Sequence, residues 1–255
     1  MRRKSPPGLG SAAGLIAGYF ALQILVGLMF VLAVTVATLV IHPGQSPQAA
    51  IGNALARPAM QAWLAIASLG LAAPLTLWLA HRQWRPWWSL DRPPGLGFHA
   101  PHRAHFWILA VSIGLLAPWL GALLTQWLAQ GHAVTQDIQQ IGSRTPMAPR
   151  MLLIMVVVCL GPMVEELLFR GVLLSALLTR WNASVAVTGS SLLFALIHLP
   201  GLDYQWYALP NLLLLALLLT ALRLRSGSIW PGVLAHGINN LLAVIGWFAV
   251  FKPTG

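Results

Sequence analysis

The sequence predicts an all-α fold, a polytopic membrane helix bundle of about seven transmembrane spans around a polar intramembrane cavity. Hydrophobic residues make up 58% of the 255 residues and charged residues 8%, whereas ordinary soluble domains contain about 25% charged residues. The apolar residues form runs long enough to cross a hydrocarbon core of about 30 Å. The single cysteine, Cys159, lies in one of these runs. An intramolecular disulfide is therefore excluded, and we expect a buried, inert thiol.

The N-terminal part, residues 1–150, is expected to hold three spans and their loops. The first apolar run follows a basic start and is about twice as long as the core of a signal peptide, which has ~7–15 residues. We therefore expect it to be retained as a span. The three spans are predicted at residues 12–41, 59–80 and 106–128. The polar segment 130–150 is expected to be a solvated connection, with a short surface helix over QDIQQIGSR as the alternative.

The C-terminal part, residues 151–255, is expected to form the membrane core with four more spans. They are predicted at residues 151–179, 183–199, 207–222 and 231–250. The first of these is too long for a simple crossing and contains Gly161 and Pro162. Proline removes a backbone hydrogen bond and commonly kinks a helix, so a break at this point would open space beside Glu165.

The distribution of charge predicts a location and an orientation. The formal net charge of +10 would suggest nucleic-acid binding in a soluble protein. Here the basic residues are spread through the short segments between apolar runs, as the positive-inside rule describes. We expect a multi-pass protein of the cytoplasmic (inner) cell membrane with its N-terminus in the cytoplasm. The lipid bilayer is its expected partner, and no nucleic acid is expected.

The stretch VEELLFR places several charges inside an apolar run. Glu165 and Glu166 are the only glutamates of the chain, and Arg170 follows within two turns. A charged side chain at the centre of a membrane helix costs at least about 2.5–3.5 kcal/mol, so such residues face a partner or a cavity. Residues i and i+4 share a helix face. This spacing pairs Glu166 with Arg170 and leaves Glu165 for chemistry.

Two further polar pairs are predicted to lie near Glu165. Phe194 and His198 are one turn apart at the end of a span, and His236 and Asn240 are one turn apart in the last span. The turn between the two spans concerned lies midway between Glu165 and His198, so an antiparallel hairpin brings these two residues to the same depth. We place the site near the middle of the bilayer.

The chemistry of these side chains suggests hydrolysis. A carboxylate beside an imidazole in a low-dielectric pocket can take a proton from water, and a second imidazole and a carboxamide can donate hydrogen bonds to a developing oxyanion. The same residues could instead bind zinc. Structural and transport interpretations stay open as well. The histidines could form hydrogen bonds that hold neighbouring helices together. The charged residues could form a buried ion pair or a proton relay in a transporter.

In order, Glu165-Glu166-x-x-x-Arg170, Phe194-x-x-x-His198 and His236-x-x-x-Asn240 resemble the three motifs of the CPBP family of intramembrane proteases, over residues 161–241. That family includes type II CaaX prenyl endopeptidases and bacterial Abi and bacteriocin-processing or immunity proteins. The resemblance implies peptide-bond hydrolysis within or near the membrane. It assigns water activation to Glu165 and His198, oxyanion stabilisation to His236 and Asn240, and support to Glu166, Arg170 and Phe194.

The resemblance does not determine the cofactor or the substrate. The family is often labelled metallo-dependent, and a metal-free, glutamate-based mechanism is also argued for it. Our first expectation is that no cofactor is required, with zinc on Glu165, His198, His236 and Asn240 as the alternative. The expected substrate is a membrane-associated protein or peptide, and the prenyl group of the CaaX substrates is not carried over.

Two other functions are retained as alternatives. One is a catalytically silent immunity or scaffold protein of the same family, and the other is a proton-coupled transporter that uses Glu165 as the carrier. The intact set of four polar residues favours the enzyme. The lack of detectable repeated halves in the sequence counts against the transporter.

Overall fold

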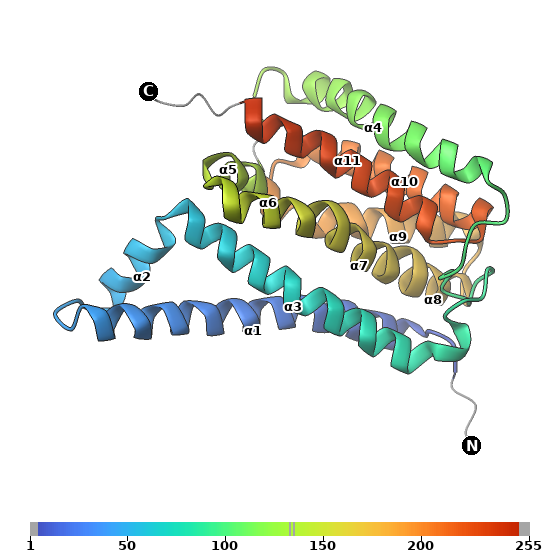
Figure 1. Ribbon diagram of the computed structural model, residues 1–255. Helices are drawn as coiled ribbons and strands as arrows, with labels where there is room; N and C mark the ends of the chain where they lie inside the picture. Colours follow the sequence, from blue (N-terminus) through green and yellow to red (C-terminus); the bar gives the residue numbers. More distant parts are fainter. Residues whose placement is uncertain (1–4, 133, 135, 250–255) are drawn as a thin grey trace.

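The computed structural model describes residues 5–132, 134 and 136–249, the last three by their backbone alone. Within these residues the regular structure is helical and contains no strand. The long helices lie side by side along a common direction, and the chain runs back and forth between the two ends of the bundle (Figure 1). The predicted all-α class is confirmed.

Five helical stretches are long and apolar enough to cross a membrane. They are α1 (Leu9–Ile41), α3 with a following 3-10 turn (Pro58–Trp87), α4 (His105–Ala129), α6 to α8 (Met147–Leu178) and α10 with a preceding 3-10 turn (Trp206–Ser226). Of the other two predicted spans, α11 is a helix over Trp230–Ala249, and α9 (Ala183–Ile197) has only 15 residues. At 1.5 Å per residue α9 is about 22 Å long. It is therefore shorter than a hydrocarbon core of about 30 Å.

The α6 to α8 rod runs through the middle of the bundle (Figure 1). Its parts are α6 (Met147–Met155), a first π-helical segment (Val156–Leu160), α7 (Gly161–Glu166), a second π-helical segment (Leu167–Leu173) and α8 (Leu174–Leu178). The break predicted at Pro162 therefore takes the form of wider π turns on both sides of α7. Such segments inside helices are frequent at functional sites.

Pro162 leaves one backbone carbonyl of the rod without a helical donor. The N–H of Gly161 bonds the Val156 carbonyl, five residues earlier. The next donor in this register would be Pro162, which has no N–H. The Val157 carbonyl instead accepts a hydrogen bond from Asn240 Nδ2 of α11, at 3.0 Å. A side chain of a neighbouring helix thus satisfies the group that proline frees, as is usual in membranes.

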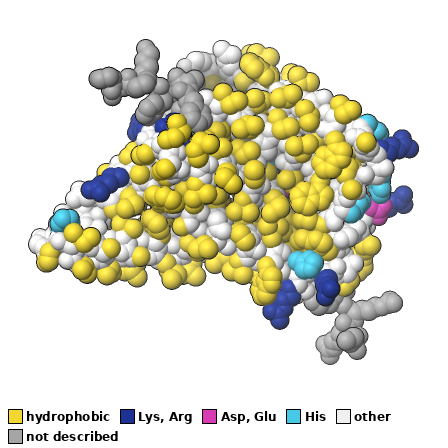
Figure 2. Space-filling view, viewed as in Figure 1, with side chains coloured by type: hydrophobic (Ala, Val, Ile, Leu, Met, Phe, Trp, Pro, Cys, Tyr) yellow, Lys and Arg dark blue, Asp and Glu magenta, His cyan; other side chains and the backbone are white. Residues whose placement is uncertain are grey.

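The sides of the bundle are apolar, and the charged side chains on the visible face lie toward its ends (Figure 2). Leu28, Leu116 and Trp127 are each at least 60% exposed on α1 and α4. This is the surface of a multi-pass membrane protein whose sides contact lipid. Cys159 is exposed, so the prediction of a buried thiol is wrong. An apolar run does not imply burial in a membrane protein, because its lipid-facing side is apolar too.

Two short helices lie at the end of the bundle where α1 finishes. α2 (Pro47–Leu55) follows α1, and α5 (Asp137–Arg144) replaces the solvated connection expected from the sequence. Arg150 holds the end of α5, because its Nε donates to the Thr145 carbonyl at 2.9 Å and its Nη2 to the Ser143 carbonyl at 3.0 Å. These bonds satisfy carbonyls that a helix end leaves free.

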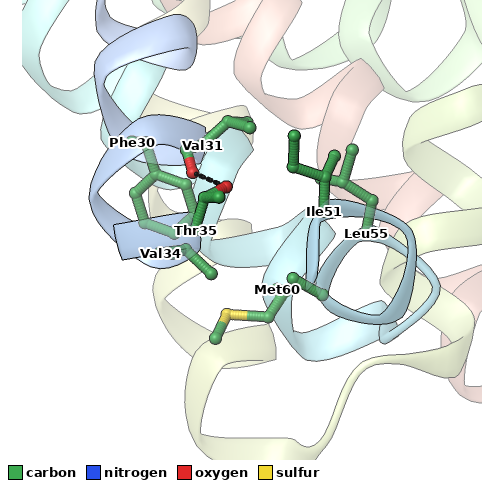
Figure 3. Close-up of a pocket in the computed structure, with 8 residues that line it drawn as sticks. Phe30, Val31, Val34, Thr35, Ile51, Leu55 and Met60 are labelled. Atoms are coloured by element: carbon green, nitrogen blue, oxygen red, sulfur yellow. Dashed lines mark hydrogen bonds between the residues drawn. The ribbon is translucent and has the colours of Figure 1, made fainter. Parts of the chain in front are cut away.

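A small apolar pocket lies between α1 and the segment from α2 to the start of α3 (Figure 3). Its lining includes Phe30, Val34, Ile51, Leu55 and Met60, and none of the predicted site residues. We assign this pocket to helix packing.

A folded segment at residues 88–104, which we call the cap segment, covers the end of the bundle where α10 finishes and α11 begins. Its Gly97 carbonyl accepts from the Ile229 N–H at 2.9 Å. Its Gly95 carbonyl accepts from the Ser175 hydroxyl at 3.2 Å. The cap segment therefore ties α8 to the start of α11 at one level.

Arg223 of α10 fixes the cap segment to the end of the bundle. It is 1% exposed, and it donates to the carbonyls of Asp91 and Gly95 at 2.7 Å and of Gly227 at 2.9 Å. Gly97 has a φ of 77°, and a Cβ on it would lie 2.7 Å from Arg223 Cζ. Glycine is thus required there by its conformation and by the close guanidinium.

Arg223→Lys is expected to destabilise the protein, because a single ammonium cannot reproduce the forked contacts to three carbonyls. Loss of one hydrogen bond to a charged group lowers the free energy of unfolding by about 1.5–3 kcal/mol. Thermal melts in detergent measure this, with the exposed Arg225→Lys as the matched control. Equal midpoints for the two variants would contradict the anchoring role.

Candidate active site

Three helices bring Glu165, His198 and His236 together. Glu165 lies on α7, His198 directly follows α9, and His236 lies in the second turn of α11. Glu165 Oε2 is 3.8 Å from His198 Nε2 and 3.7 Å from His236 Nε2. The predicted meeting of Glu165 and His198 at one depth is confirmed.

The other ring nitrogen fixes the orientation of each histidine. His198 Nδ1 is 2.7 Å from the Phe194 carbonyl, one turn earlier on α9. His236 Nδ1 is 3.2 Å from Glu166 Oε1. A carbonyl and a carboxylate accept hydrogen bonds, so each Nδ1 carries a hydrogen. Both Nε2 atoms are consequently directed toward Glu165, because the other nitrogen of each ring is hydrogen-bonded.

Glu166 and Arg170 form the ion pair predicted from their spacing. Arg170 Nη1 donates to Glu166 Oε1 at 2.8 Å, and the two side chains are 0% and 1% exposed. Arg170 Nη2 also donates to the Ala216 carbonyl of α10, at 3.3 Å. A Cβ on Gly232 of α11 would lie 3.0 Å from Glu166 Oε2. The pair therefore fixes how α10 and α11 approach α7.

Phe194 lies at the centre of this group and is fully buried. Arg170 Cζ is 4.3 Å from the centroid of its ring, a cation–π contact. The ring centroids of His198 and His236 are 4.7 and 5.7 Å from that of Phe194. Its predicted supporting position is consistent with these contacts, because one ring packs against the guanidinium and both imidazoles.

Asn240 makes its hydrogen bonds to residues other than Glu165 in the described part of the chain. Within the described part of the chain its Nδ2 bonds the Val157 carbonyl, and its Oδ1 accepts from Asn239 Nδ2 at 3.3 Å. The structure therefore shows a bracing bond that sequence reasoning missed. A role for the amide at the reacting atoms stays a prediction.

The side chains of this group differ in accessibility. His198 and Glu165 keep 31% and 22% of their side-chain surface exposed, whereas His236 keeps 5% and Glu166 1%. A substrate can therefore reach the site from the side of Glu165 and His198. The buried side chains, His236 and Glu166, form the inner side of the site.

Comparison with protein families shows a match over this same region. Residues 147–242 match the family described as type II CAAX prenyl endopeptidase Rce1-like. We call this matched region the Rce1-like domain. The match confirms the resemblance to the CPBP proteases over residues 147–242. Neither the curated proteins nor the solved structures contain a significant match to the chain.

The Rce1-like domain does not assemble the donor set that the sequence suggested for zinc. Asn240 Oδ1, the amide atom that would bind a metal, accepts from Asn239. Among the residues that the structure describes, no group of three His, Cys, Asp or Glu side chains is placed to hold a metal ion. As they stand, Glu165, His198, His236 and Asn240 do not fit a tetrahedral zinc site.

Sequence reasoning also missed the bond between Glu166 and His236. The two residues are 70 positions apart, so no local spacing connects them. The available signal was chemical: a histidine inside an apolar helix needs a polar partner, and the chain offers few acidic ones.

Glu166→Gln and Arg170→Met are each expected to destabilise the domain, because either change leaves a buried partner charged and alone. Breaking such a pair costs about 3–5 kcal/mol. The double replacement should be milder than the sum of the two. Thermal melts of the singles and the double in detergent test this coupling, and simple additivity would contradict it.

Proposed function

We propose that the protein is an intramembrane endopeptidase that hydrolyses a peptide bond of a membrane-associated protein or peptide. The observation that carries this proposal is the accessible Glu165 carboxylate, which faces the Nε2 atoms of two oriented histidines inside an Rce1-like domain. A carboxylate that is placed beside an imidazole can remove a proton from a water held between them.

In the proposed reaction Glu165 removes a proton from a water held between its carboxylate and His198. The water oxygen bonds to the substrate carbonyl carbon, and the negative charge moves to the carbonyl oxygen. When this intermediate collapses, the carbon–nitrogen bond breaks and the proton held by Glu165 passes to the leaving amine. Base and acid are thus one residue, used in succession.

We assign stabilisation of the oxyanion to His236 and Asn240. His236 donates from Nε2 only as an imidazolium, and the carboxylates of Glu165 and Glu166 lie on its two sides to balance that charge. Asn240 Nδ2 has two hydrogens, of which Val157 takes one. The other is available for the substrate, and one such donor contributes about 2.7–4 kcal/mol to the transition state.

The charge distribution supports an orientation for this enzyme. The described arginines at the cap-segment end of the helices are Arg82, Arg85, Arg92, Arg103, Arg180, Arg223 and Arg225, and those toward the other end are Arg57, Arg144 and Arg150. By the positive-inside rule the cap segment faces the cytoplasm. We therefore propose an inner-membrane protein with a cytoplasmic N-terminus.

A silent immunity or scaffold protein of the same family is the second candidate. It requires the fold and the buried Glu166–Arg170 pair but gives no reason for two histidines to point at an accessible carboxylate. A proton-coupled transporter would use Glu165 alone. Hydrolysis is the function that uses the whole group.

Glu165→Gln is expected to abolish hydrolysis and to leave the melting temperature within a degree or two of the parent, because the amide keeps the shape and loses the base. Asp203→Asn, at an exposed position, is the control. The assay compares membrane proteomes of cells that carry the parent, Glu165→Ala or no copy of the protein. Peptides that accumulate without Glu165 are substrates, and cleavage that persists in purified Glu165→Gln would overturn the assignment.

Activity is expected to survive exhaustive chelation, because the proposed mechanism assigns every proton transfer to side chains. Metal analysis of the purified protein accompanies the assay. A zinc enzyme behaves differently: His198→Ala and His236→Ala each release a stoichiometric metal, and added zinc restores the chelated parent. If the purified protein contains zinc and removal of the zinc stops cleavage, a zinc-dependent mechanism replaces the metal-free one.

A further inference from the structure

Helix α1 carries two polar side chains that find no hydrogen-bond partner among the described residues. Tyr19 is 3% exposed and Gln23 is half-buried, and neither side chain makes a hydrogen bond within the described chain. The two residues are four positions apart and share one face of α1. A hydroxyl or amide without a partner is costly in a membrane, where no water replaces the missing bond.

This face of α1 lies beside the candidate active site. Tyr19 belongs to the same buried cluster as Val164, Leu167 and Leu168, which flank the two glutamates on the rod. α1 also packs against the second π-helical segment of the rod.

The depth of Tyr19 in the bundle agrees with this placement. It lies about ten residues, or about 15 Å, after the start of α1 at Leu9. Glu165 lies about ten residues before Ser175, which bonds the cap segment at the same end of the bundle. α1 starts at that end as well (Figure 1). Tyr19 and Glu165 are therefore at one level.

We propose that Tyr19 and Gln23 bind the backbone of the peptide substrate next to Glu165, so that α1 completes the active site from outside the Rce1-like domain. This inference rests on the proposed function. A scissile peptide is extended, and its N–H and C=O groups need partners inside a membrane. The Gln23 amide donates and accepts, and the Tyr19 hydroxyl donates, which matches the two kinds of backbone group.

The pair has the properties of a substrate-binding element rather than of helix packing. A packing role would require each group to bond a neighbouring helix in the free protein, as Ser190 does when it donates to the Phe169 carbonyl. Tyr19 and Gln23 instead remain unpaired at the level of the base. Their unpaired groups become satisfied when an extended chain lies between α1 and α7.

The test uses Tyr19→Phe and Gln23→Leu, which remove only the polar groups. Each is expected to lower kcat/KM about five- to tenfold for peptides that depend on Glu165, the effect of losing one hydrogen bond. The melting temperature should stay equal or rise, because neither group has a partner to lose. The controls are Tyr204→Phe and Gln126→Leu, both at exposed positions. Unchanged kcat/KM in both variants, or a lowered melting temperature, would overturn the inference.

A second measurement does not depend on hydrolysis. A photoreactive benzoylphenylalanine replaces Gln23 in Glu165→Gln protein, and the same residue at Ile24, which is 64% exposed, is the matched control. Crosslinks to peptide from position 23 but not from position 24 support the binding role. Crosslinks from position 23 to lipid or to a second copy of the chain overturn it.

The two measurements separate this inference from the proposed function. If Glu165→Ala changes no peptide in the membrane proteome but position 23 still captures peptide, then hydrolysis fails and the peptide path stands. If Glu165-dependent cleavage is present and position 23 captures no peptide, the enzyme stands and the role of α1 falls.

Discussion

The buried charge of Glu166 and Arg170 is the constraint on which the C-terminal half depends. An ion pair in a low-dielectric interior is tolerated only when further partners complete it. Here these partners come from three other helices: the Ala216 carbonyl of α10, the ring of Phe194 on α9, and His236 of α11. Four helices must therefore meet at one level, and the level at which they meet is that of Glu165.

The backbone of α7 imposes a second constraint on α11. Because Pro162 cannot donate, the Val157 carbonyl takes its hydrogen bond from Asn240. A Cβ on Gly237 would lie 2.8 Å from the Val158 carbonyl oxygen, so α11 approaches this stretch at van der Waals distance. Gly237 and Asn240 are about one helical turn apart, and their two contacts together set the register of α11. The same register directs His236 toward the two glutamates.

Local spacing predicted much of this arrangement, and contacts between distant segments lay beyond it. The pairing of Glu166 with Arg170 and the equal depth of Glu165 and His198 follow from 1.5 Å and 100° per residue. The bond of His236 to Glu166 depends on tertiary packing, as does the contact of Asn240 with Val157. The exposure of Cys159 was missed for another reason, since hydropathy does not distinguish lipid-facing from buried positions.

The two adjacent glutamates have different surroundings. Glu166 is 1% exposed and is held by Arg170 and His236, so its position is fixed and its charge is balanced. Glu165 is 22% exposed, and its neighbours are two Nε2 atoms at 3.7 and 3.8 Å. Those distances exceed a direct hydrogen bond, so the three side chains surround a position rather than close on one another. In the proposed mechanism, that position holds the water from which Glu165 removes a proton.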